Sequence, residues 1–225
     1  MLISLLENLI YNNWCKICGN AFFFKNQNIF CKDCLNQIKK EKILYCPSCG
    51  KKTFNCMDCR KNRKFTQVEI FTTYSFIFQE VIKFYKFKNF KNLSTEIAQL
   101  ISDDLSTFIE KNNINFILYI PSPPSKEKER GFNHLKEILI KCVPKWIIRD
   151  DLAKVKNTPL QVDLSQEERR ENIKNSFKLL NKEIYTDKNV LIFDDILTTG
   201  STIHEAYREV KKAKPKNIYA YIIAT

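Results

Sequence analysis

The sequence predicts an α/β domain built on a parallel sheet, preceded by a small cysteine-rich module. Eight of the nine cysteines lie within residues 15–59, and the rest of the chain carries short apolar runs that alternate with helical patterns. Such alternation is typical of a parallel sheet covered by helices on both faces. We therefore expect a zinc-ribbon module over residues 1–65 and the α/β domain over residues 66–225.

The cysteines of the module form four pairs with the same spacing, each with two residues between its members. The candidate metal ligands are Cys15, Cys18, Cys31, Cys34, Cys46, Cys49, Cys56 and Cys59. Two thiolates three positions apart on a tight turn converge on one tetrahedral ion, and Gly19 and Gly50 permit the positive φ that such turns need. The spacing predicts two structural zinc ions, each bound by four cysteines and without an open position for chemistry.

The order of the pairs favours one zinc site formed by the first four cysteines and a second formed by the last four. An interleaved arrangement satisfies the same spacings, so the sequence leaves the pairing open. We expect no secretory signal, and closely paired thiols in a reducing compartment bind metals more often than they form disulfides. The expected location is therefore the cytoplasm.

The first expected elements run from the N-terminus to the middle of the α/β domain. Residues 1–10 form an apolar stretch interrupted by acidic and polar positions, and they are shorter than the roughly 20 residues of a membrane-spanning helix. We expect an amphipathic helix there and no membrane span. The domain then begins with a strand over residues 68–74, helices over 78–87 and 93–111, and a buried strand over 116–120.

The second half of the domain continues the same alternation. Its expected elements are a helix over 132–141, a strand over 146–148, a helix over 166–172, a strand over 190–193, a helix over 201–214 and a strand over 218–224. In a sheet of this kind, ligands bind beyond the carboxyl ends of the strands.

One strand-to-helix connection carries the chemistry. Residues 190–193, Val-Leu-Ile-Phe, have the composition of a buried strand, and they end in Asp194 and Asp195. A turn of small residues then opens a helix: Thr198, Thr199, Gly200, Ser201 and Thr202. Free N–H groups and the positive end of a helix dipole bind phosphate, and carboxylates accept hydrogen bonds from sugar hydroxyls or help to hold magnesium. The segment predicts a site for a sugar phosphate.

The glycine content excludes several other nucleotide and ester sites. The chain has four glycines: Gly19, Gly50, Gly131 and Gly200. Neither a Walker A loop, nor a dinucleotide fingerprint, nor a serine-hydrolase elbow can be written with them. The two histidines, His134 and His204, and the lone Cys142 form no recognisable site, and we expect them to be structural.

A loop fixed by prolines follows the strand expected at residues 116–120. It carries Ser122, Lys126 and Arg130. On a neighbouring strand, such a loop would hold a diphosphate, whose negative charge Lys and Arg stabilise. Residues 126–130 also have the composition of a solvated segment of mixed charge, which favours no ligand.

Two further segments allow two interpretations each. Residues 154–177 are long and polar, and they fit either a mobile hood over an active site or a simple connector. Residues 83–91 mix aromatic rings with lysines, as a platform for single-stranded nucleic acid does. The helical spacing of Ile77, Val81 and Phe84 instead favours a helix end whose rings enter the core.

Residues 190–202 resemble, position by position, the phosphoribosyl pyrophosphate motif of the type I phosphoribosyltransferases: four apolar residues, two acidic, two apolar, then Thr-Thr-Gly and two small residues. Nearly the whole chain resembles the ComF family of competence proteins, which combine cysteine pairs, an Arg-Gly-Phe-Asn element (residues 130–133 here) and this loop. His134 stands where that family often has Gln, and Ser122 interrupts a stretch that is usually more apolar. Neither departure falls within the diagnostic loop at residues 190–202.

The resemblance implies a phosphoribosyltransferase-like fold and a set of roles. Asp194 and Asp195 would bind the ribose hydroxyls and magnesium, and residues 198–202 the 5-phosphate of phosphoribosyl pyrophosphate. Ser122, Lys126 and Arg130 would contact the diphosphate. In a catalytic protein, an acceptor would attack the anomeric carbon and expel diphosphate through an oxocarbenium-like state, without a protein nucleophile. The family further implies a role in natural transformation, with incoming single-stranded DNA and DNA-uptake proteins as partners.

The distribution of charge indicates binding partners less clearly than the motifs do. Residues 1–65 hold 12 Lys and Arg against 4 Asp and Glu, whereas residues 66–225 hold 25 against 21. A basic module attracts nucleic acid, but a lysine-rich composition produces the same excess without any binding role.

Three functions are therefore compatible with the sequence. The first is an enzyme that transfers phosphoribose to an unidentified acceptor, which would release diphosphate in the presence of magnesium. The second is a DNA-uptake factor whose pocket only senses a nucleotide or phosphate, which would bind DNA without Asp194 and Asp195. The third is a zinc-ribbon adaptor, which would capture a protein partner without residues 66–225. We favour a combination of the first two.

Overall fold

A five-stranded parallel sheet forms the centre of the protein. The computed structural model describes residues 13–22, 29–41, 43, 45–46, 64–87, 90–155 and 173–225. Every neighbouring pair in the sheet is parallel, in the order β3-β9-β8-β4-β5. The strands are β3 (Gln67–Thr72), β4 (Phe116–Tyr119), β5 (Ile148–Arg149), β8 (Asn189–Ile196) and β9 (Asn217–Ala224). The predicted α/β architecture with a parallel sheet is confirmed.

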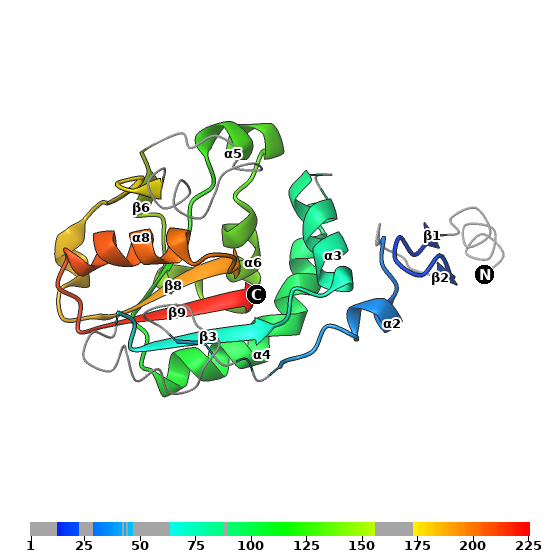
Figure 1. Cartoon of the computed structure of the whole chain (residues 1–225), viewed down its shortest axis with the longest axis horizontal. Coiled ribbons are helices and arrows are strands. Elements are labelled where there is room, and N and C mark those ends of the chain that lie inside the picture. Colours follow the sequence, from blue (N-terminus) through cyan, green and yellow to red (C-terminus); the bar gives the residue numbers. More distant parts are fainter. Residues whose placement is uncertain are drawn as a thin grey trace.

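Helices cover both faces of this sheet (Figure 1). On one face α8 (Ser201–Lys211) packs against β8 and β9, and on the other lie α4 (Leu93–Lys111) and α6 (His134–Cys142). The ring of Phe108 in α4 meets two tyrosines of β9 edge-on, Tyr219 and Tyr221. Because both faces are covered, the strands are apolar on both sides, and residues 190–193 of β8 are fully buried.

The sheet has its topological switch point between β4 and β8. These two strands are neighbours, with Tyr119 opposite Phe193. From β4 the chain proceeds to β5 at one edge, whereas from β8 it proceeds to β9 on the other side. In open α/β sheets, ligands bind in the crevice beyond the carboxyl ends of the strands at such a point. The ends of β4 and β8 lead directly into the two segments that carry the predicted site.

Strand β8 is longer than predicted. We expected it to end at Phe193, before the two acids, and this was wrong: Asp194 pairs with Ile222 and Ile196 with Ala224 of β9. The ladder continues because β9 is itself eight residues long. Successive residues of a strand project to opposite sides, so the two carboxyl groups have different surroundings.

Four of the predicted helices of the domain are present, one of them with the predicted bounds (Leu93–Lys111) and three with one or both ends shifted. The expected helices correspond to α3 (Phe76–Phe87), α4, α6 and α8. A 3₁₀ turn over Lys145–Ile147 replaces most of the strand expected at residues 146–148, and only β5 follows it. Pro144 explains why a helical turn forms here and a strand does not, because its φ of −57° and its missing N–H favour the start of a helical turn.

Several elements were missed. The segment expected as a proline-fixed loop forms α5 (Pro124–Arg130), which has proline in its first turn and Gly131 at its end with a φ of 76°. An antiparallel pair, β6 (Leu152–Lys154) and β7 (Phe177–Leu179), was not predicted because each strand is only three residues long. A second 3₁₀ turn covers Lys182–Tyr185.

Two predicted helices, over residues 1–10 and 166–172, lie outside the described residues. Most of the segment 154–177, predicted as either hood or connector, also lies outside them. Within the part of the chain that the structure describes, no helix has the length and apolar character needed to cross a bilayer.

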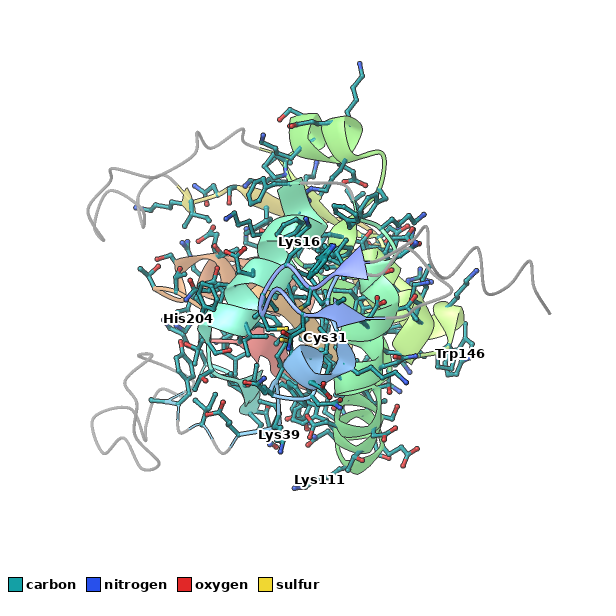
Figure 2. All side chains as sticks on the ribbon, turned by 90° about the vertical axis from the view of Figure 1, so that its right-hand side faces the viewer. Lys16, Cys31, Lys39, Lys111, Trp146 and His204 are labelled. Atoms are coloured by element: carbon teal, nitrogen blue, oxygen red, sulfur yellow. The ribbon has the colours of Figure 1, made fainter. Side chains whose placement is uncertain are left out.

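The cysteine-rich module packs against α3. It contains a short hairpin, β1 (Asn13–Trp14) and β2 (Ala21–Phe22), and a one-turn helix, α2 (Lys32–Leu35). The ring of Phe30 meets Phe84 of α3 edge-on, with 5.5 Å between their centroids. Figure 2 views the protein from the side of the module, with Cys31 in front of the helices and Trp146 and His204 at opposite edges.

The residues after α2 join the module to the edge of the sheet. The amide of Glu41 donates to the carbonyl of Phe71 in β3 (2.8 Å), and its carboxylate accepts from the hydroxyl of Thr73 (2.8 Å). Lys40 forms an ion pair with Asp104 of α4 (2.7 Å). These contacts cover part of the edge of β3, so the module and the sheet share one packed interior. The boundary between residues 65 and 66 stays a prediction.

We predict that Asn133→Ala lowers the free energy of unfolding by about 1 kcal/mol, because its side chain caps α6 by accepting from the amides of Leu135 and Lys136 (both 3.1 Å). Denaturant unfolding followed by circular dichroism measures the change. Asn92→Ala is the matched control, since Asn92 begins α4 without a side-chain cap. An equal loss in the two variants would show that the cap of α6 contributes nothing specific.

Candidate functional site

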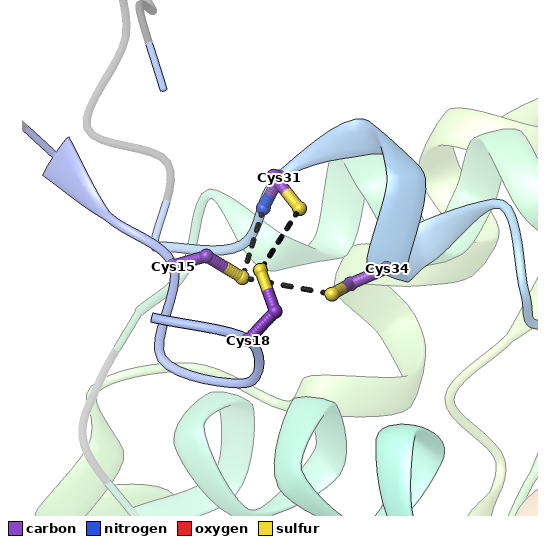
Figure 3. Close-up of side chains that lie close together, drawn as sticks. All are labelled: Cys15, Cys18, Cys31 and Cys34. Carbon is purple, nitrogen blue, oxygen red and sulfur yellow. Dashed lines mark hydrogen bonds between the residues drawn. The ribbon is translucent and has the colours of Figure 1, made fainter. Parts of the chain in front are cut away.

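Four thiols of the module meet in one cluster (Figure 3). Cys15 and Cys18 lie on the turn after β1, where Gly19 has a φ of 73°, and Cys31 and Cys34 lie at the start of α2 and within it. The Sγ atoms of Cys15 and Cys34 are 3.8 Å apart, as are those of Cys18 and Cys31, and all four lie within 4.8 Å of one another. A tetrahedral ion with metal–sulfur bonds of about 2.3 Å requires edges of about 3.8 Å. The four thiols could therefore hold a metal ion.

The electrostatics of the cluster also fit a cation. Burial opposes ionisation of Cys15, yet backbone hydrogen bonds, including one from the amide of Cys31 (3.4 Å), lower its pKa to about 6. Burial and the neighbouring thiols raise the pKa of Cys34. Each thiolate thus makes the next one harder to form. A divalent cation offsets the repulsion between the thiolates, because it stabilises all of them together.

This grouping is the one that sequential pairing of the cysteines gives for the first site. Of the second predicted set, Cys46 is described and buried, at 4% exposure. Its predicted partners Cys49, Cys56 and Cys59 lie outside the described residues. A second metal ion stays a prediction.

Asp195 is the centre of a polar cluster at the carboxyl end of the sheet. Its side chain is buried, and its Oδ2 atom accepts from the ammonium group of Lys86 (2.5 Å) and from Nε2 of His134 (2.8 Å). Burial opposes ionisation, but Lys86 and His134 hold the pKa of Asp195 below its usual range. Lys86 lies in the last turn of α3 and His134 is the first residue of α6. Asp195 therefore links three elements.

His134 connects Asp195 to two of the predicted diphosphate residues. Its Nδ1 lies 3.1 Å from the hydroxyl of Ser122 and 3.2 Å from Nη1 of Arg130. Burial lowers the pKa of His134, which keeps the ring neutral near pH 7. Since Nε2–H donates to the carboxylate, Nδ1 accepts from Ser122 and Arg130. The structure thus brings Ser122 and Arg130 to Asp195, while their contact with a diphosphate stays a prediction.

Asp194 is buried beside this cluster and differs from Asp195 electrostatically. Its Oδ1 accepts from the amide of Asp195 (2.9 Å). Burial, followed by the negative charge of Asp195, raises the pKa of Asp194. The two adjacent acids therefore resist carrying two negative charges together until a cation or hydrogen-bond donors arrive.

The turn from β8 into α8 has the form of an anion site. The amide of Leu197 donates to the carbonyl of Ala224 (2.8 Å), which attaches the start of the turn to β9. Gly200 has a φ of 74° and directly precedes α8, and the hydroxyls of Thr199 and Ser201 lie 2.9 Å apart. The first N–H groups of a helix have no partners within it, so α8 begins with amides available to an anion. All five predicted phosphate residues, Thr198, Thr199, Gly200, Ser201 and Thr202, lie on this turn or in the first turn of α8.

The cysteine-rich module reaches the same turn. If residue 200 were any other amino acid, its Cβ atom would lie 2.9 Å from the hydroxyl oxygen of Tyr45 and 3.5 Å from the ring of His204. This close approach, together with the positive φ, explains the glycine at this position. His204 is in turn packed against Phe65, with 5.9 Å between the rings. A side chain from the module therefore forms one wall of the phosphate turn.

Lys126 does not join these groups. It lies on α5 and pairs with Glu129 of the same helix (2.9 Å), with no contact to the Asp195 cluster among the interactions of the described residues. This pairing matches the alternative interpretation of residues 126–130 as a solvated charged segment, because α5 has no buried residue.

Sequence reasoning missed two members of the cluster. His134 was expected to be structural or at the surface; it is buried, and its contact with Asp195 was not anticipated. Its position directly after the Arg-Gly-Phe-Asn element was the available signal. Lys86 lies in the aromatic and basic segment 83–91, where we weighed a nucleic-acid platform against core packing. The core interpretation holds for Tyr85, which is fully buried, but neither interpretation anticipated the ion pair of Lys86.

Comparison with known proteins finds one domain family and several relatives. Residues 138–225 match the phosphoribosyl transferase domain family. Competence protein F of Haemophilus influenzae is 26% identical, covering 95% of this chain and 97% of its own length. The ComFC competence protein of Bacillus subtilis is 27% identical (90% and 86% covered), and that of Streptococcus pneumoniae 24% identical (87% of each). The chain is a homologue of the ComF competence proteins.

The resemblance to the ComF family predicted from the motifs is thus confirmed. The two kinds of match cover different parts of the site. The domain family begins at residue 138, so it contains β8, the two acids and the phosphate turn. The relatives extend over the cysteine-rich module and over Lys86, Arg130 and His134 as well. The cluster around Asp195 therefore combines an acid within the region that matches the phosphoribosyl transferase domain family with residues that precede this region.

We predict that Cys34→Ser lowers the bound metal by one ion per chain and lowers the melting temperature of the whole protein, not of the module alone. The reason is that Phe30, between the two cysteine pairs, packs against α3. Metal analysis and scanning calorimetry measure both effects. Cys142→Ala is the control, since Cys142 lies on α6 outside the cluster. Unchanged metal content in Cys34→Ser would contradict the assignment of the site.

Proposed function

We propose that this ComF homologue binds phosphoribosyl pyrophosphate at the end of β8 and acts in natural transformation. One observation supports the binding above all others. Two buried acids and a turn that opens a helix at Gly200 lie at the switch point of a parallel sheet, in the order of the phosphoribosyl pyrophosphate motif. Carboxylates and free amides are then spaced along one stretch of backbone, as one sugar phosphate needs.

The proposed ligand would be held from both ends. Residues 198–202 would bind the 5-phosphate through backbone amides and hydroxyl groups, and Asp194 and Asp195 would bind the ribose hydroxyls. Arg130 and Ser122, which reach Asp195 through His134, would face the diphosphate end. Lys126 is a weaker candidate, because its ammonium group is engaged by Glu129 on the surface of α5.

Magnesium fits this arrangement. It prefers oxygen ligands and is usually held by one or two carboxylates together with phosphate oxygens of the substrate, which Asp194, Asp195 and a diphosphate would supply. When bound, the ion neutralises charge on the diphosphate. The chain itself contributes orientation, because Asp195 is fixed by two neighbours, and it excludes water, because both acids are buried.

The reaction that we propose is phosphoribosyl transfer. An acceptor would form a bond to the anomeric carbon while the bond from that carbon to diphosphate breaks, and the diphosphate would leave with both bonding electrons. Positive charge develops on the sugar, so positioning and charge stabilisation supply the catalysis and no protein nucleophile is needed. The chemistry of the acceptor is left open.

We further propose that zinc occupies the four-cysteine cluster, with a second zinc bound by Cys46, Cys49, Cys56 and Cys59. Tetrahedral sulfur ligation favours zinc over harder cations. With four cysteine ligands the ion would be structural and would not take part in the reaction. Reduced thiols of this kind also support a cytoplasmic location.

The relatives named competence proteins support a role with incoming DNA, and the module offers a surface for a single strand. Trp14 is 60% exposed and Lys16 is also exposed, close by on the turn that carries the cysteines. An exposed ring can stack on a base while an ammonium group pairs with a phosphate, in any sequence context. The module is also the more basic part of the chain. DNA-uptake proteins would be the protein partners.

We predict that Asp194→Asn with Asp195→Asn weakens binding of magnesium phosphoribosyl pyrophosphate by roughly 100-fold or more, because two charge-assisted interactions are lost. Isothermal calorimetry measures the affinity, and circular dichroism checks that the variant is folded. Asp150→Asn is the control, since that exposed acid contacts Lys136 and the hydroxyl of Tyr119 and, among the described residues, contacts neither Asp194 nor Asp195. Unaltered affinity in the double variant would refute the proposed site.

We predict that Trp14→Ala lowers the affinity for an oligothymidine by roughly 5-fold to 100-fold and that Lys16→Ala reduces the salt dependence of binding. Fluorescence anisotropy at several salt concentrations measures both. Trp146→Ala is the matched control, because that ring is also exposed, at 74%, but lies away from the module (Figure 2). If Trp146→Ala has the larger effect, the DNA surface is not on the module.

A further inference from the structure

Lys86 is the one cation in direct contact with the predicted acids among the described residues, and no motif assigns it a role. It projects from the last turn of α3, its side chain is 19% exposed, and its ammonium group lies 2.5 Å from Oδ2 of Asp195. The residue precedes the region that matches the phosphoribosyl transferase domain family by 52 positions. Its contact with the site therefore follows only from the packing of α3.

The geometry of the contact determines what Lys86 does to Asp195. The ammonium group and Nε2 of His134 both bind the same carboxylate oxygen, Oδ2. Neither contact uses Oδ1. With one oxygen held by two donors, the plane of the carboxylate is fixed and the second oxygen is left to accept from a ligand.

Lys86 is itself held in place by its neighbours. Nε of Arg130 donates to the backbone carbonyl of Lys86 (2.7 Å), and the hydroxyl of Tyr85 donates to the backbone carbonyl of His134 (2.6 Å). The end of α3 and the segment 130–134 thus each donate a side-chain hydrogen bond to a backbone carbonyl of the other. Lys86, Asp195, His134 and Arg130 form a closed ring of polar contacts. Such a ring reduces the number of arrangements that the side chains can adopt before a ligand arrives.

We propose that Lys86 is a positioning residue of the sugar site, which together with His134 holds Oδ2 of Asp195 so that Oδ1 is aimed to receive a ribose hydroxyl. The proposal rests on the proposed function of the same site. Lys86 would not contact the 5-phosphate, which binds at the far end of the sugar. Its effect should therefore appear with a ligand that has ribose hydroxyls and vanish with an anion that only fills the phosphate turn.

The experiment compares two probes, ribose 5-phosphate and inorganic phosphate, binding to the full chain by calorimetry without magnesium. We expect Lys86→Met to weaken ribose 5-phosphate binding about 10-fold or more, and phosphate binding by less than about 2-fold. Lys86→Arg keeps the charge and should recover most of the loss. Lys83→Met is the control on the same helix, because the side chain of Lys83 is 61% exposed and, within the described part of the chain, forms an ion pair with Glu80 and none with the two acids.

A second variant keeps the test decisive if Lys86→Met is poorly folded. The pair Lys86→Met with Asp195→Asn removes both charges together and leaves no unpaired ion inside the protein. We expect it to bind ribose 5-phosphate no more weakly than Asp195→Asn alone, since Lys86 acts through Asp195. An additional loss in the pair would overturn the proposal.

Three further outcomes would also overturn it. Equal losses for both probes would show that Lys86 is only structural. Unchanged binding of ribose 5-phosphate by Lys86→Met would show that Asp195 does not need it, and tighter binding would show that Lys86 competes with the sugar. Failure of the wild-type protein to bind ribose 5-phosphate while it binds phosphate would instead remove the proposed function, on which this inference depends.

Discussion

The candidate site depends on the way in which the carboxylate of Asp195 is held. A buried acid next to a second buried acid is costly to ionise, and Lys86 together with His134 reverses that cost. The two donors come from α3 and α6, so the ion pair also fixes these helices at the carboxyl end of β8. Stability and ligand recognition therefore rely on the same contacts, and a change in either helix would reach the predicted sugar site.

The second constraint is the packing of the cysteine-rich module on the sheet. Phe30 lies between the two cysteine pairs and contacts Phe84, only two residues before Lys86. Lys40 and Glu41 attach the segment after α2 to α4 and β3, and Tyr45 approaches Gly200. A metal ion bound by the four thiols would thus stabilise the surroundings of the phosphate turn as well as the module. This arrangement gives a physical reason for the presence of a cysteine cluster and a predicted sugar-phosphate site in one chain.

The polar cluster also shows how a change of one side chain alters a shared site. His134 stands where the ComF family often has Gln, and the imidazole donates from Nε2 to Asp195 while it accepts at Nδ1 from Ser122 and Arg130. An amide offers the same combination of one donor end and one acceptor end. The neutral ring, maintained by burial, therefore preserves the hydrogen-bonding pattern that glutamine would supply, although it cannot supply a second donor to the carboxylate.

The sequence by itself determined the α/β class, the four cysteine pairs and the position of the turn at residues 198–202, but the structure decided that the first two pairs meet in one cluster. Each depends on local chemistry: thiols at one repeated spacing, a buried run, and small residues that start a helix after two acids. Only the tertiary structure decided that β8 continues through both acids, because this depends on the length of its partner β9. It also decided the roles of Lys86, His134 and Tyr45, which are separated from Asp195 and Gly200 by between 61 and 155 positions. Contacts between residues so far apart in the sequence arise from the packing of the elements on the sheet, and no local sequence pattern predicts them.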